Sequence, residues 1–259
     1  MELNTEKMIG EKEGGIGWMT FNNPARRNAM SLDMWEAVET ILDEFESDDD
    51  IKVIVMRGAG DKAFVSGADI SEFKERRNNA EAAAEYARIS EGARARLMGV
   101  KKPLIAMIRG YCLGGGMAVA MAADMRFATE DSQFGIPAAR LSIAYGYDGL
   151  HKLVHLVGPA MASEIMFTAR RVQPDEAQRI GLINRAVPVD ELETAVREVA
   201  DAICRNAPLS IAASKHTIGQ ILTDKEDRDY DEIKRMSQMC FDSNDYKEGR
   251  EAFMEKRSP

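Results

Sequence analysis

The chain has 259 residues, of which 45% are hydrophobic and 30% are charged, and its formal net charge at pH 7 is −9. This length and composition predict a globular protein with a substantial core that needs no metal or disulfide to hold it together. The acidic balance argues against nucleic acid or an anionic membrane as the main partner.

The cysteines and the N-terminus give expectations about the compartment. Cys112, Cys204 and Cys240 are widely spaced, with neither a Cys-x-x-Cys pair nor an accompanying histidine pattern. They therefore predict reduced thiols and no metal site. The first residues lack the basic and then apolar pattern of a signal peptide, and no apolar run approaches the roughly 18 residues of a membrane span. We expect a cytoplasmic protein with no membrane segment.

The first part of the chain alternates between strand and helix patterns. The apolar run Ile16–Phe21 predicts a strand, and a helix is expected from Ser31 because apolar residues then recur every three or four positions as far as Phe45. A buried strand is expected at 52–57. The next expected elements are a helix starting at Ser71, a helix over 80–100, and strands at 104–108, 125–128 and 133–135.

This alternation predicts an α/β architecture with mainly parallel strand pairing. From residue 148 onward the pattern changes to successive helices, broken near Gly158, Pro174 and Pro208, and only residues 182–187 read as a strand. We therefore expect an α/β part at 1–147 and a helical part at 148–259.

Three consecutive glycines, Gly114, Gly115 and Gly116, open directly into an apolar segment that favours a helix. Glycine lets another molecule approach the main chain closely, and the first N–H groups of a helix have no partner within the helix. The pattern therefore fits either a tight helix entry or a cradle for negative charge on a ligand oxygen. The segment 63–73, with a glycine among small residues, is a second candidate for exposed backbone donors.

Six segments resemble the crotonase, or enoyl-CoA hydratase/isomerase, superfamily in order and spacing. The resemblance covers nearly the whole chain, and no single segment would have been specific enough to carry it. The segments are FNNPARRNAM at 21–30, AFVSGADISEF at 63–73, GYCLGGGMAVAMAAD at 110–124, FGIPAARLSIAYGYDGL at 134–150, RRVQPDEAQRIGLINRAVP at 170–188 and the terminal EAFMEKR.

The resemblance implies a spiral of ββα repeats as the core at 1–147, followed by a helical region at 148–259 that packs subunits into a homotrimer or a dimer of trimers. It also implies an acyl-CoA thioester as the substrate, and no cofactor beyond the CoA moiety of that substrate. Neither nucleic acid nor a membrane is expected as a partner.

The resemblance further assigns roles to individual residues. The backbone N–H groups of Ala68 and Gly115 would form an oxyanion hole for the thioester carbonyl oxygen. An ordinary solvated charge remains the alternative for Arg26 and Lys256. The positions expected to contact substrate or CoA are Ala25, Arg26, Ser66, Asp69, Ile70, Gly114, Phe253 and Lys256, the last two from a neighbouring subunit in many members.

Two positions depart from the family pattern. Hydratases of the family use two glutamates as acid and base, and this chain has Ala118 and Ala138 at the matching positions. Acid and base groups of this kind contribute roughly 10²–10⁴-fold each, so conventional hydration is disfavoured. A thioester enolate can still be reached by loss of CO₂, and the segment around Tyr145 resembles a loop of methylmalonyl-CoA decarboxylase. Tyr145 is therefore a candidate catalytic residue, and Arg140 could hold a carboxylate or pair with an acid of the helical part.

Other interpretations stay open from the sequence. Tyr147, Asp148 and His151 lie close to Tyr145, although each has an ordinary structural role available to it. The chain could be a decarboxylase or other atypical lyase, or a hydratase whose acid and base come from other positions. It could also be a non-catalytic member that binds acyl-CoA.

Overall fold

The computed structural model describes residues 1–69, 71 and 80–258 of the chain. Most of the helix expected from Ser71, and the substrate-binding prediction for Ile70, lie outside the described residues. The chain divides into two compact units, Met1–Asp201 and Ala202–Pro259. The functional division at residue 147 therefore stays a prediction, and each unit is described below by itself.

The first unit is built on a six-stranded sheet with the order β1-β2-β3-β5-β7-β9. All neighbouring strands are parallel except the β1–β2 hairpin, so the expectation of mainly parallel pairing is confirmed. The edge strand β1 was not expected, because its sequence MIGEKE is mostly polar and exposed. The strands are β1 (Met8–Glu13), β2 (Ile16–Phe21), β3 (Val53–Gly58), β5 (Leu104–Ile108), β7 (Met125–Thr129) and β9 (Arg185–Val187).

A second sheet contains three short parallel strands in the order β4-β6-β8. They are β4 (Ala63–Val65), β6 (Tyr111–Leu113) and β8 (Gln133–Gly135). Because the strands are parallel, the segments that follow them leave from the same edge. Open parallel sheets commonly bind ligands at the carboxyl ends of their strands, so this edge is the natural place to look for a site.

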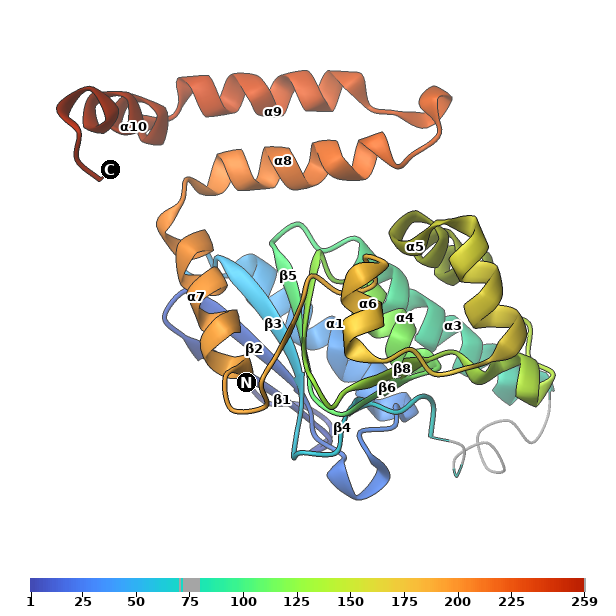
Figure 1. Ribbon diagram of the computed structural model, residues 1–259. Helices are drawn as coiled ribbons and strands as arrows, with labels where there is room; N and C mark the ends of the chain where they lie inside the picture. The colour runs from blue at the N-terminus through green and yellow to red at the C-terminus, as the bar shows by residue number, and fades with distance from the viewer. Residues whose placement is uncertain (70, 72–79, 259) are drawn as a thin grey trace. The chain divides into compact units, whose positions relative to one another are not determined.

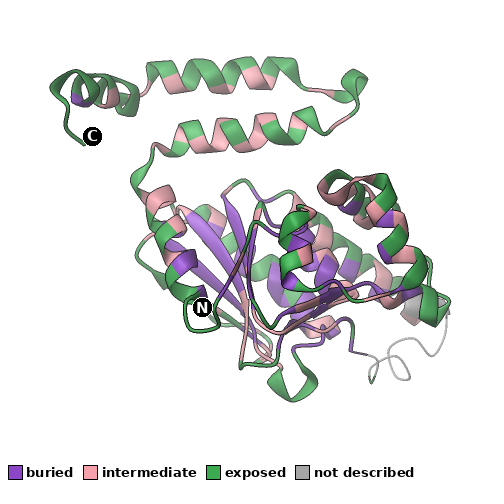
Figure 2. Cartoon of the chain, in the orientation of Figure 1, coloured by how far each residue is buried: buried purple, intermediate pink, exposed green. Residues whose placement is uncertain are grey.

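Helices α1 (Leu32–Ser47) and α3 (Ala80–Met98) pack against each other on one face of the large sheet (Figure 1). Helix α1 buries the apolar face that its sequence predicted, including Val38, Ile41 and Phe45. The strands and the inward sides of these helices form the buried core (Figure 2). The third helix at this core is α4 (Gly115–Ala122), which starts directly after the glycine turn.

The remaining elements of the first unit are helical, and those that follow residue 147 were expected to be. Helix α5 (Tyr147–Thr168) is kinked at Gly158, whose φ of 77° is outside the helical range, and Pro159 follows it. The short helices η1 (Pro24–Arg26) and η3 (Pro137–Leu141) each start with a proline, and α6 (Pro174–Arg179) does so as well. Helix α7 (Leu192–Arg205) runs across the division between the units.

The second unit consists of helices with little core of their own. They are α8 (Pro208–Ile221), η4 (Lys225–Asp227), α9 (Tyr230–Asp242) and α10 (Asn244–Glu255). Among its described residues only Ala252 is buried, whereas large apolar side chains such as Ile221, Phe241 and Phe253 are exposed (Figure 2). None of the helices that the structure describes is long and apolar enough to cross a membrane.

Candidate active site

The main chain at Ala68 is oriented by its pairing with Met30. The two residues form an isolated parallel bridge, in which the Met30 N–H donates to Gly67 O at 2.8 Å and the Asp69 N–H donates to Met30 O at 2.8 Å. In a parallel bridge the residue between the two bonded ones turns its own N–H and C=O to the opposite side. The N–H of Ala68 is therefore directed away from Met30 and available to another acceptor.

The second backbone donor is Gly115, the first residue of α4. Gly114 precedes it with φ 53° and ψ −115°, a conformation that only glycine adopts readily. The α4 N–H groups of Met117 and Ala118 both turn back to Gly114 O, at 3.1 and 3.4 Å. As the first helical residue, Gly115 has no acceptor for its N–H within the helix.

The two donors lie close together. A Cβ atom built on Gly115 would be 3.7 Å from the Ala68 nitrogen and 3.8 Å from Gly67 Cα. The glycine at 116 allows α4 to approach β4 this closely. A Cβ atom on Gly116 would be only 2.0 Å from Val65 O at the end of β4. Within the described residues neither N–H, of Ala68 or of Gly115, donates a hydrogen bond. Two unpaired N–H groups that face one space can bind a single oxygen atom, so the glycine turn fits the expected cradle.

Ala68 and Gly115 line a cavity of about 280 Å³. Its other walls come from helices α1 and α3, which sequence reasoning did not connect with the site. The side chains of Tyr86 and Ser90 are buried there, whereas Glu91 is exposed and Arg94 is half-buried. The described residues that line it are Trp35, Ala68, Tyr86, Ala87, Ser90, Glu91, Arg94 and Gly115.

A signal for this wall was present in the sequence. Tyr86, Ser90, Ala93 and Leu97 recur every three or four positions, and all four are buried in the structure. The helix was expected, but its polar composition hid this inner face. Arg94 lies at the border of the face, with its Cζ 5.6 Å from the centroid of the Trp35 ring.

Tyr145 precedes α5 and is half-buried against the core. Its hydroxyl oxygen is buried and has no hydrogen-bond partner among the described residues. Burial raises the pKa of this phenol to about 12, opposed by the positive charge of Arg94. A Cβ atom on Gly149 would be 2.4 Å from Tyr145 Cε1, so the glycine makes room for the ring. Tyr145 does not line the 280 Å³ cavity, although it lies within the electrostatic reach of Arg94.

Ala118 and Ala138 also lie near the glycine turn. Ala118 is in the first turn of α4, and Ala138 is buried in η3 directly after Pro137, whose Cδ would be 3.8 Å from a Cβ atom on Gly114. Their methyl groups cannot transfer a proton. These two side chains therefore supply neither an acid nor a base.

The residues expected to flank CoA are brought together in part. The Ser66 hydroxyl donates to Arg26 O at 3.4 Å, and the Ser66 N–H donates to Arg27 O at 3.2 Å. The short helix that carries Ala25 and Arg26 therefore lies beside the loop that leads to Ala68. Asp69 is buried, and its Oδ1 accepts bonds from the Ser71 N–H and hydroxyl at 3.0 and 2.6 Å, so its side chain is occupied by the local turn.

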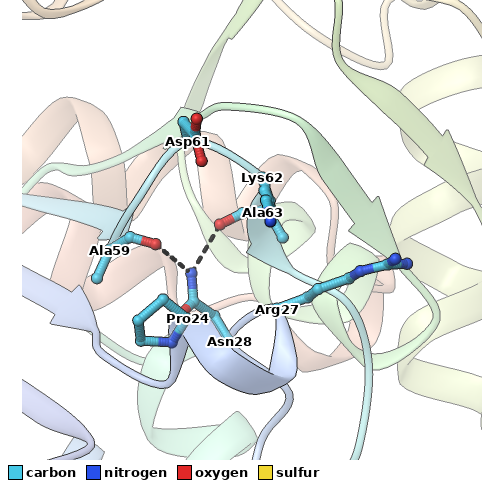
Figure 3. Close-up of a pocket in the computed structure, with 7 residues that line it drawn as sticks. All are labelled: Pro24, Arg27, Asn28, Ala59, Asp61, Lys62 and Ala63. Carbon is cyan, nitrogen blue, oxygen red and sulfur yellow. Dashed lines mark hydrogen bonds between the residues drawn. The ribbon is translucent and has the colours of Figure 1, made fainter.

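A smaller cavity of about 180 Å³ lies next to η1 (Figure 3). Asn28 stabilises its wall by donating to Ala59 O at 3.0 Å and to Ala63 O at 2.7 Å. Arg27 extends away from Asn28 in Figure 3, and its Cζ lies 5.3 Å from the centroid of the Tyr111 ring. The lining residues are Pro24, Arg27, Asn28, Ala59, Asp61, Lys62 and Ala63.

Three predicted residues are not joined to this arrangement. Arg140 is an exposed residue of η3, and it forms no hydrogen bond or ion pair with the part of the chain that the structure describes. Phe253 and Lys256 belong to the second unit, where Phe253 is 81% exposed and Lys256 ends α10 with φ 57°. Their expected contacts with CoA stay predictions.

The sequence model of the enoyl-CoA hydratase/isomerase family matches residues 11–259. The chain belongs to this family. The short-chain-enoyl-CoA hydratase of Clostridium acetobutylicum is 37% identical over 257 residues, which cover 99% of this chain and 97% of that protein. The crotonyl-CoA hydratase of Syntrophomonas wolfei is 33% identical, over 97% of this chain and 96% of that protein.

Solved structures give the same result for the fold. An enoyl-CoA hydratase/carnithine racemase from Magnetospirillum magneticum superposes with a TM-score of 0.92 at 34% identity, covering 99% of this chain and 95% of that one. A putative enoyl-CoA hydratase/isomerase family protein from Hyphomonas neptunium gives a TM-score of 0.90 at 33% identity. The α/β fold of the crotonase superfamily is therefore confirmed, and the chain is an enzyme of the enoyl-CoA hydratase/isomerase family.

Proposed function

We propose that the chain binds an acyl-CoA thioester with the carbonyl oxygen held by the N–H groups of Ala68 and Gly115. The observation that carries this proposal is the convergence of these two unpaired donors on one cavity. Donors fixed by the backbone stabilise the charge that develops on this oxygen when an enolate forms. Each such donor typically contributes about 3–4 kcal/mol to transition-state stabilisation.

We infer that the enolate is reached by decarboxylation. In this step the bond between the α carbon and a carboxylate breaks, its electron pair forms the enolate, and CO₂ leaves. The α carbon of the enolate then takes a proton from solvent. No base is required for the first step, which suits a site with Ala118 and Ala138 beside the donors. Tyr145, whose phenol is protonated at neutral pH and whose pKa burial raises further, would position the substrate carboxylate.

Hydration of an enoyl-CoA is the second candidate, because the curated relatives are named as hydratases. Hydration needs an acid and a base near the α and β carbons. Glu91 is the one carboxylate among the described residues that line the cavity. This candidate therefore predicts that Glu91→Gln removes most of the crotonyl-CoA hydration activity.

Three measurements on the purified protein separate these functions: hydration of crotonyl-CoA, exchange of the α proton of butyryl-CoA, and release of CO₂ from methylmalonyl-CoA. Release of CO₂ without hydration supports the decarboxylase. Hydration that depends on Glu91 supports the hydratase. If all three activities are absent while acyl-CoA still raises the unfolding temperature, the protein is a binding member of the family.

We also propose that helices α8 to α10 form a subunit interface in a homotrimer or a dimer of trimers, with Phe253 and Lys256 reaching the CoA of a neighbouring subunit. The support is the exposed apolar side chains of this unit, which exceed what a solvated surface needs. Light scattering after size-exclusion chromatography gives the subunit number. A monomer at micromolar concentration would contradict the proposal.

A further inference from the structure

Helix α3 carries three arginines, and they differ in their partners. Arg88 pairs with Glu85 at 2.7 Å, and Arg96 pairs with Glu46 at 2.5 Å. Arg94 forms no ion pair or hydrogen bond within the described part of the chain. It is also the arginine of this helix that lines the cavity with Ala68 and Gly115. An arginine left without an acceptor at this place needs an explanation.

The position of Arg94 suits a planar anion. Its side chain is half-buried, and the ring of Trp35 lies 5.6 Å from its Cζ, a distance at which cation–π attraction holds the guanidinium in place. A guanidinium has five N–H donors in a fixed planar arrangement that matches the two oxygens of a carboxylate. Hydrogen bonds between a guanidinium and a carboxylate are stronger than those between neutral groups, so a carboxylate that replaces water at Arg94 gains affinity.

The other polar groups near Arg94 are consistent with this role. Arg94 is the one cationic residue among the described residues that line the cavity. The hydroxyl of Tyr145 is buried and has no hydrogen-bond partner among the described residues, but Tyr145 does not line this cavity, so the contact with the anion rests on Arg94. Glu91 lies one helical turn before Arg94, is exposed, and forms no ion pair with it. Glu91 therefore leaves the guanidinium free.

We propose that Arg94 binds a carboxylate on the acyl group, so that the cavity takes carboxyacyl-CoA thioesters in preference to uncharged acyl-CoA thioesters. This inference rests on the proposed position of the thioester at Ala68 and Gly115. It names the substrate class of that site and makes Arg94 the residue that determines specificity.

The proposal has a kinetic consequence if the carboxylate is the group that leaves. The negative charge moves from the carboxylate to the thioester oxygen as CO₂ departs, so an ion pair with Arg94 stabilises the ground state more than the transition state. Arg94 then contributes to binding and selectivity and does not accelerate the loss of CO₂. Replacement of Arg94 should raise KM for the carboxyacyl-CoA at least tenfold and leave kcat unchanged or higher.

The test measures binding of malonyl-, succinyl- and glutaryl-CoA by calorimetry, each against the straight-chain acyl-CoA with the same number of carbons: propionyl-, butyryl- and pentanoyl-CoA. Succinyl- and glutaryl-CoA carry no carboxylate on the α carbon, so they are not decarboxylated through the enolate. The variants are Arg94→Gln, Arg94→Lys and, as a matched control on the same helix, Arg88→Gln, which removes an exposed arginine that does not line the cavity. The affinity for CoA itself and the unfolding temperature report whether each variant is folded.

We expect at least one carboxyacyl-CoA to bind the unaltered protein about 10–100-fold more tightly than its uncharged counterpart, the range for a hydrogen-bonded ion pair. Arg94→Gln should reduce this preference to less than about twofold, and Arg88→Gln should retain it. The inference is overturned if the unaltered protein shows no such preference, or if the preference survives in Arg94→Gln. CO₂ release is a separate readout. If the preference depends on Arg94 but no CO₂ is released, the decarboxylase proposal is wrong and the proposal for Arg94 stands.

Discussion

Replacement of Gly115 by alanine separates the catalytic role of this glycine from a structural one. Gly115 has an ordinary helical conformation, and the added methyl group would meet no atom closer than 3.7 Å. Alanine is more favourable than glycine inside a helix by about 0.5–1 kcal/mol, so the variant should unfold at the same temperature or slightly higher. Stability alone therefore gives no reason for a glycine here.

The methyl group should nevertheless disturb the proposed oxyanion site. An oxygen bound by both donors would lie about 2.9 Å from each nitrogen. The new Cβ atom would be 3.7 Å from the Ala68 nitrogen and would crowd the same gap. Alanine keeps the backbone N–H, so the effect comes from displacement of the oxygen from the two donors, and removal of one donor, which lowers kcat by about 10²–10³-fold, sets its scale. We expect a loss of this size in CO₂ release, with unchanged affinity for free CoA.

Gly116→Ala is the matched control on the adjacent residue. Its methyl group would lie 2.0 Å from Val65 O and 2.8 Å from Val65 C, which are backbone atoms that cannot move aside easily. Overpacking of this kind costs about 1–3 kcal/mol, so this variant should lose stability together with activity. Thermal unfolding and steady-state kinetics on both variants provide the assay. If Gly115→Ala keeps kcat within about threefold of the unaltered protein, the proposed oxyanion site is wrong.

Three further predictions concern Tyr145 and the core. Gly149→Ala should push the Tyr145 ring aside, because the methyl group would come within 2.4 Å of Cε1, and CO₂ release should fall about 10–10²-fold without loss of CoA affinity. Burial raises the pKa of Tyr145 to about 12 from the usual value of about 10, so the free energy of unfolding should fall as the pH rises from 10 to 12. Denaturant titrations should show a smaller fall in Tyr145→Phe. Arg126 is buried and donates to Leu182 O at 2.8 Å and to Ala123 O at 2.6 Å. In the same titrations Arg126→Met should lower the free energy of unfolding by about 2–4 kcal/mol, whereas Arg88→Met should change it by no more than about 0.5 kcal/mol.

Outcomes against these predictions are equally specific. Unchanged CO₂ release in Gly149→Ala and in Tyr145→Phe would remove Tyr145 from the mechanism. An alkaline loss of stability that is the same in Tyr145→Phe would show that other groups produce it. A loss in Arg126→Met no larger than in Arg88→Met would mean that the two carbonyl oxygens find other donors.

The sequence predicted the elements whose patterns are strong and local. Strand Ile16–Phe21, strand Leu104–Ile108 and the buried face of α1 were expected from apolar runs and from helical spacing, and the structure confirms them. The edge strand β1 was missed because one-sided exposure leaves a polar sequence. Local pattern therefore identifies the longer buried elements better than the edge strand β1 or the three-residue strands β4 and β6, which were also missed.

The site was predictable only where the backbone forms it. The glycines at 114–116 predicted the start of a helix and a main chain that a ligand can approach closely. The second donor, Ala68, was predicted from the family resemblance. Arg94 was missed because its significance depends on Trp35 from another helix and on the absence of a described partner. The expected roles of Phe253 and Lys256 depend on a second subunit, which a single chain cannot provide.

The bridge between Met30 and Ala68 affects which substitutions this enzyme can accept during evolution. The hydrogen bonds of Met30 with Gly67 and Asp69 orient the Ala68 N–H. The direction of this donor is therefore set by backbone pairing and does not depend on any side chain. Substitutions at the surrounding positions, including 118, 138, 91 and 94, can exchange one chemistry for another while this donor stays in place. A library that varies those four positions together should therefore yield folded proteins that still bind acyl-CoA, even where the reaction has been lost or replaced.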